Sequence, residues 1–140
     1  MSTEENQRIC DALFPLAWNE GDFSLVDEHV SPEVVDHFDH SQGIDAFKGV
    51  IGMFRGAFPD LHLTIEDSLA DGDKVVHRWS MTGTNEGSLM GIPPTGRAMT
   101  WTGTTIVRLE DGKIVERWAN VDVLGILQQM GVVPPPPGAP

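Results

Sequence analysis

Two Asp-Gly turns constrain the second half of this chain more than any other feature of the sequence. ADGDK at 70–74 and EDGK at 110–113 each separate segments of β-type composition, and an Asp-Gly pair in that setting is a strong hairpin signal. A loop rich in glycine and proline, MGIPPTG, separates the second expected strand from the third. These features predict an antiparallel meander, whose strands we expect at 61–69, 74–86, 99–109 and 114–121.

The N-terminal segment carries the pattern of an amphipathic helix. Ser2 and Glu5 form an S-x-x-E capping box, which is typical of a helix start. Apolar residues then recur at helical spacing over 9–17. Pro15 lies within this run and is expected to kink the helix, and Gly21 is a plausible end.

The next segments complete the prediction of an α+β fold. A short helix is expected at 23–29, a short strand at VVDHF (34–38), and a helix from Ile44 that stops before Pro59. Helices followed by a meander predict a curved antiparallel sheet with the N-terminal helices laid on one face, which together form a cone-shaped α+β barrel. Such a cone has an interior in which small ligands bind.

Length and charge exclude several classes of protein. The chain has 140 residues, which suits a single domain at 1–131 followed by a proline-rich tail at 132–140 that we expect to be mobile. The net charge of −12 repels nucleic acid and anionic membranes, so neither is an expected partner. The sequence has no apolar run of membrane-spanning length, and the single Cys10 fits a reducing cytoplasm.

The last expected strand runs directly into the last expected helix. Counting by twos along it puts Trp118, Asn120 and Asp122 on one face. Asp122 allows two interpretations: an N-cap of the helix at 122–130, or a carboxylate aimed into a pocket. In a pocket, burial would raise its pKa toward the range of a general base, and Asn120 could hydrogen-bond the carboxylate or a substrate oxygen.

The segment DHFDH groups Asp36, His37, Asp39 and His40. Side chains of these types bind transition metals, but local spacing supplies no third histidine and a strand would turn His37 and His40 to opposite sides. We therefore expect no metal and instead favour His37 as an acid or hydrogen-bond donor in the pocket.

The four tryptophans allow a core interpretation and a pocket interpretation. Trp101 shares its strand face with Gly103 and Thr105 and is our candidate for an aromatic pocket wall, whereas the face of Trp79 is left open. His77 alternates with apolar neighbours and is expected to be a satisfied buried histidine.

The chain resembles the SnoaL-like polyketide cyclases of the nuclear-transport-factor-two-like superfamily. The matching segments cover nearly everything except the tail; they are WNEGD (18–22), AFPDL (57–61), RWSMTGTNEGSLMGIPPTGR (78–97), LEDGKIVERW (109–118) and DVLGILQQMG (122–131). The resemblance implies ring closure by an intramolecular aldol reaction on a polyketide ester, without cofactor or metal. It also implies that Asp122 acts as the general acid or base, and that the positions of Trp18 and Val50 shape the pocket.

The chain departs from the family pattern at Thr105, Asn85 and Arg117, where the family commonly carries histidine.

The main hypothesis is a cofactor-free cyclase, with Asp122 as catalyst and Asn120 and His37 as polar helpers. We expect its pocket to take a hydrophobic, aromatic ligand and the protein to form a homodimer through sheet faces. The departures favour an alternative, a non-catalytic binder of a hydrophobic small molecule, and an isomerase, dehydratase or hydrolase is a third possibility. The pocket would be lined by Trp18, Val50, Phe54, Trp101, Thr105 and Trp118.

Overall fold

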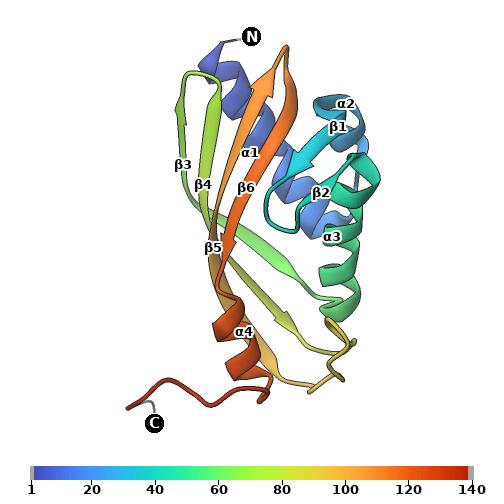
Figure 1. Ribbon diagram of the computed structural model, residues 1–140, viewed down its shortest axis with the longest axis vertical. Coiled ribbons are helices and arrows are strands. Elements are labelled where there is room, and N and C mark those ends of the chain that lie inside the picture. The colour runs from blue at the N-terminus through green and yellow to red at the C-terminus, as the bar shows by residue number, and fades with distance from the viewer. Residues whose placement is uncertain (1, 139–140) are drawn as a thin grey trace.

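The computed structural model describes residues 2–138 and shows one six-stranded sheet with four helices (Figure 1). The strands lie in the order β2-β1-β6-β5-β4-β3. The α+β class predicted from the sequence is confirmed, although the sheet is open rather than closed into a barrel. The helices are α1 (Thr3–Glu20), α2 (Ser24–His29), α3 (Ile44–Ala57) and α4 (Val123–Gln129), and the strands are β1 (Val30–Asp36), β2 (Ser41–Gln42), β3 (His62–Asp71), β4 (Lys74–Thr84), β5 (Ala98–Glu110) and β6 (Lys113–Val121).

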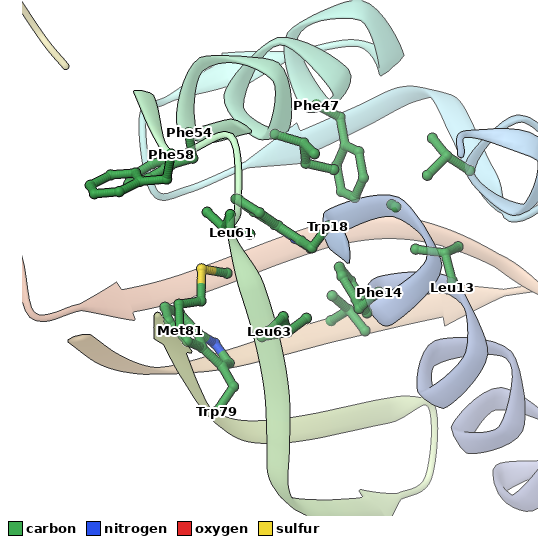
Figure 2. Close-up of a cluster of buried hydrophobic side chains, with 14 of the residues drawn as sticks. Leu13, Phe14, Trp18, Phe47, Phe54, Phe58, Leu61, Leu63, Trp79 and Met81 are labelled. Carbon is green, nitrogen blue, oxygen red and sulfur yellow. The ribbon is translucent and has the colours of Figure 1, made fainter. Parts of the chain in front are cut away.

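Helix α1 begins and ends where the sequence predicts. The Ser2 side chain accepts a hydrogen bond from the Glu5 backbone N–H at 3.1 Å, which satisfies one of the free donors of the first turn. At the other end, Gly21 adopts φ +66°, a left-handed conformation that glycine reaches without strain. Buried side chains on one face of α1, among them Leu13, Phe14 and Trp18, turn toward the sheet (Figure 2).

The meander β3–β6 has the predicted antiparallel pairing. Strand β1 differs, since it pairs in parallel with β6 and so makes the sheet mixed. It spans Val30–Asp36 rather than 34–38, because residues 37–40 form a turn in which His40 has φ 60°. The β1–β6 register shifts between Val30 and Val35, around Pro32, which has no N–H to give to the ladder.

A one-residue bulge sits near the start of β6. Arg108 pairs with Glu116 but Leu109 pairs with Ile114, so Val115 is left over. An extra residue in one strand reverses which side chains face the core beyond it. Ile114 and Arg117 are therefore both buried, although they differ in parity.

The sheet bends around the two long helices. Figure 1 shows β3 and β4 sweeping past α1 and then beneath α3. Apolar side chains of α1 and α3 meet those of the strands in this concave space; Figure 2 shows Phe14, Trp18, Phe54, Leu63, Trp79 and Met81 there. No helix within residues 2–138 combines the length and the apolar character needed to cross a membrane.

The proline-rich end makes little contact with the domain. Residues 134–138 are exposed and belong to neither helix nor strand. Residues 139–140 of the expected tail lie outside the described part of the chain, and the mobility of the tail stays a prediction.

Candidate active site

An apolar cavity lies between α1, α3 and the concave face of the sheet. The space between its walls amounts to about 510 Å³, a volume that includes open solvent at the mouth, and the gap between the aromatic walls is narrow. Five of the six residues predicted to line a pocket lie on its wall: Trp18, Val50, Phe54, Trp101 and Thr105. Trp79, whose face was left open, also lines it.

The sixth, Trp118, does not line the cavity. It is only half-buried, and its indole stacks on the His37 ring with centroids 5.0 Å apart. His37 likewise lies outside the cavity wall, with its side chain 39% exposed, and its Nε2 is 2.8 Å from Glu116 Oε2. Hydrogen bonds from His37 and from Arg108 lower the pKa of the Glu116 carboxyl. The placement of Trp118 and His37 in the pocket was wrong.

The carboxylate at the β6–α4 junction also faces solvent. Asp122 is exposed, and its Oδ1 accepts the Gly125 backbone N–H at 3.0 Å, which is the N-cap interpretation of this residue. Asn120 is exposed beside it. The prediction that Asp122 and Asn120 face the apolar pocket was wrong for the same reason as that of Trp118: the bulge at Val115 turns this face outward.

The prediction that His77 is a buried, hydrogen-bonded histidine is confirmed, and the same side chain also lines the cavity. His77 on β4 is 4% exposed and lines the cavity. Its Nε2 lies 2.8 Å from Asp11 Oδ1 on α1. A carboxylate only accepts, so Nε2 carries the proton of the neutral ring, and Nδ1 is left with its lone pair. Ser68 Oγ donates to the same Asp11 oxygen at 2.6 Å and holds this carboxylate in place.

Burial decides the charge of this imidazole. Desolvation lowers the pKa of His77 below its ordinary value of 6.5, and the hydrogen bond to Asp11 and its charge oppose this shift without cancelling it. His77 is thus neutral at pH 7, the form that accepts a proton. No nucleophilic thiol competes, because burial raises the pKa of Cys10 to about 12.

A buried ion pair forms another polar part of the wall. Arg117 on β6 lines the cavity, and its Nη1 donates to Asp36 Oδ2 on β1 at 2.9 Å. Both side chains are almost fully buried, at 7% and 3% exposure. Asp36 Oδ1 also accepts the Phe38 backbone N–H. Within residues 2–138 no group of three metal-ligating side chains forms, and Asp36 is engaged by Arg117.

The sequence holds only a weak signal for these two pairs. His77 and Asp11 stand 66 residues apart, and Asp36 and Arg117 stand 81 apart, so no local spacing joins them. A buried polar residue in an alternating strand is the one available hint. For Arg117 the bulge removes this hint as well, because counting by twos from Ile114 places Arg117 on the outer face.

Known proteins resemble this chain in sequence and in fold. The family model of the SnoaL-like polyketide cyclases matches residues 9–130. The chain belongs to this family. It is similar to the nogalonic acid methyl ester cyclase of Streptomyces nogalater, with 30% identity covering 82% of this chain and 90% of that one.

Two further proteins show a similar level of likeness to this chain. The aklanonic acid methyl ester cyclase DnrD of Streptomyces peucetius is 29% identical to this chain, and the alignment covers 79% of this chain and 77% of DnrD. The structure of TsrD from Streptomyces laurentii superposes with a TM-score of 0.86 at 30% identity, covering 95% of this chain and 99% of that one. The two cyclases and the family model indicate a polyketide-cyclase-like enzyme.

Proposed function

We propose that this protein closes a ring in a polyketide-type ester by an intramolecular aldol reaction, with the proton transfers carried by side chains of the cavity. The observation that carries the proposal is a buried His77, held by Asp11, on the wall of a largely apolar cavity; its lowered pKa favours the neutral ring. The names of the two cyclase relatives support the substrate class.

His77 fits the role of general base. Its free Nδ1 takes a proton from the carbon next to a carbonyl, and the resulting enolate carbon attacks a second carbonyl of the same molecule. The new carbon–carbon bond leaves an alkoxide, to which the protonated ring returns its proton, so the reaction consumes no co-reactant. Asp11 stabilises the imidazolium formed between the two steps, and the positive charge of Arg117 on the same wall favours the developing oxyanion.

The family resemblance points to another base, Asp122, and a comparison of variants separates the two. The assay follows cyclisation of nogalonic and aklanonic acid methyl esters. We expect His77→Gln to lower kcat by about 100-fold or more and Asp11→Asn to lower it in the same direction. Asp122→Asn keeps the capping oxygen and should retain turnover. Loss of turnover in a folded Asp122→Asn protein, with His77→Gln active, would return the role to Asp122.

A non-catalytic binder is the second candidate. Its specific support is the exposure of Asp122, because the carboxylate that the family resemblance makes catalytic then lies outside the cavity. Saturable binding of the two esters without any cyclised product, measured at high protein concentration, would decide for the binder.

A further inference from the structure

One residue on the cavity wall carries a buried hydrogen-bond donor that has no acceptor among residues 2–138. Trp101 on β5 is 2% exposed, and its ring packs 4.6 Å from the Phe58 ring and 6.2 Å from the Phe54 ring. Its indole Nε1 is buried, and no acceptor for it exists among residues 2–138. A buried N–H without a partner is costly, and tryptophan N–H groups normally find one.

The neighbouring tryptophan shows what a structural indole looks like in this cavity. Trp79 lies on the adjacent strand and lines the same cavity, and its Nε1 donates to Thr105 Oγ1 at 2.9 Å. Trp79 and Trp101 therefore line the same cavity, but only the N–H of Trp79 is satisfied by the protein.

The register of β4 and β5 sets the distance along the sheet between Trp101 and the proposed base, His77. His77 pairs with Thr105, and Met81 pairs with Trp101, so four residues separate the two levels along either strand. At a rise of about 3.3 Å per residue, the donor lies about 13 Å along the sheet from His77. Several fused rings span that length, and the aromatic walls between the two levels favour a flat ligand.

We propose that the Trp101 indole N–H donates a hydrogen bond to a carbonyl or quinone oxygen at the end of a flat polycyclic ligand remote from His77, and that this contact selects ligands with an acceptor there. The inference rests on the proposed function in one respect, that the cavity takes polycyclic ligands. A site built to hydrogen-bond a ligand discriminates against the analogue that leaves its donor unpaired.

A matched pair of ligands tests this contact. Anthraquinone-2-sulfonate and anthracene-2-sulfonate share their ring frame, and the first carries two ring oxygens that the second lacks. Titration calorimetry gives both dissociation constants for the wild-type protein, for Trp101→Phe, and for Trp118→Phe as the matched control outside the cavity. The ratio of the two constants cancels changes in shape and isolates the oxygen–donor contact, as in a double-mutant cycle.

We expect the preference of the wild-type protein for the quinone to fall by about fivefold to tenfold in Trp101→Phe, the size of one neutral hydrogen bond, and to stay unchanged in Trp118→Phe. An equal ratio in wild type and Trp101→Phe would overturn the donor role while the cavity and the proposed function stand. No binding of either compound to the wild-type protein would overturn the polycyclic-ligand cavity, and the donor role with it.

A second measurement covers the case in which Trp101→Phe does not fold. The wild-type protein labelled with ¹⁵N in its four indoles gives one N–H signal for each tryptophan, and the Trp101 signal is assigned from its contacts to Phe58 and Met81. The quinone should shift that N–H proton downfield, and the anthracene should not. Equal shifts with both compounds would contradict the hydrogen bond.

Discussion

The buried ion pair between Asp36 and Arg117 gives the most quantitative prediction. Asp36→Asn keeps the Oδ1 acceptor of the Phe38 N–H but leaves the buried Arg117 guanidinium without its counter-charge. Stranding one member of a buried pair costs about 3–5 kcal/mol. Since Asn keeps the shape of Asp36 and one of its hydrogen bonds, we expect a cost at the lower end of this range, about 3 kcal/mol. For a chain of this size that loss lowers Tm by about 10 °C.

Urea unfolding, followed by tryptophan fluorescence, measures this loss. Asp67→Asn is the matched control, because it makes the same chemical change in an exposed pair with Arg78, and it should change stability by less than about 1 kcal/mol. The double variant Asp36→Leu with Arg117→Met removes both charges and should restore most of the stability. The reasoning fails if Asp36→Asn costs no more than the control, or if the double variant is less stable than the single one.

Three further predictions follow from single features of the fold. Gly103→Ala should lower the free energy of unfolding by about 1–3 kcal/mol, seen as a lower urea midpoint, because its Cβ would collide with Trp79. His77 has a lowered pKa, so the unfolded chain binds the extra proton first and stability should fall as pH drops below 6.5. His77→Gln should flatten that slope, and kcat/KM of the wild type should fall only at lower pH, through the lowered pKa of the folded protein. Deletion of residues 134–140 should change Tm by less than a few degrees, since 134–138 are exposed.

Local sequence signals predicted the helices and strands, but they did not predict the pairing of strands that lie far apart in the sequence. The capping box at Ser2, the stop at Gly21 and the two Asp-Gly turns act within a few residues, so the sequence displays them directly. The parallel pairing of β1 with β6 depends on how α1 and α2 carry the chain across the sheet, which no periodicity reveals.

The same distinction explains which site residues were found. Strand β5 is regular from Trp101 to Val107, so counting by twos correctly put Trp101 and Thr105 on one face, and that face lines the cavity. On β6 a single extra residue, Val115, moved Trp118 and Asp122 to the outer face and Arg117 to the inner one. Bulges are set by the fit of two strands to each other, and the pattern of one strand alone does not contain them.

The pairing of β1 with β6 also predicts the order in which parts of the sheet form during folding. The hairpins of the meander join chain neighbours and close short loops, whereas Asp36 meets Arg117 across 81 residues, a closure with a larger entropy cost. We expect β1 to dock after the folding barrier. In stopped-flow experiments Asp36→Asn should then speed unfolding and leave the folding rate nearly unchanged. The lifetime of the folded state would be set by how long its first strand stays attached.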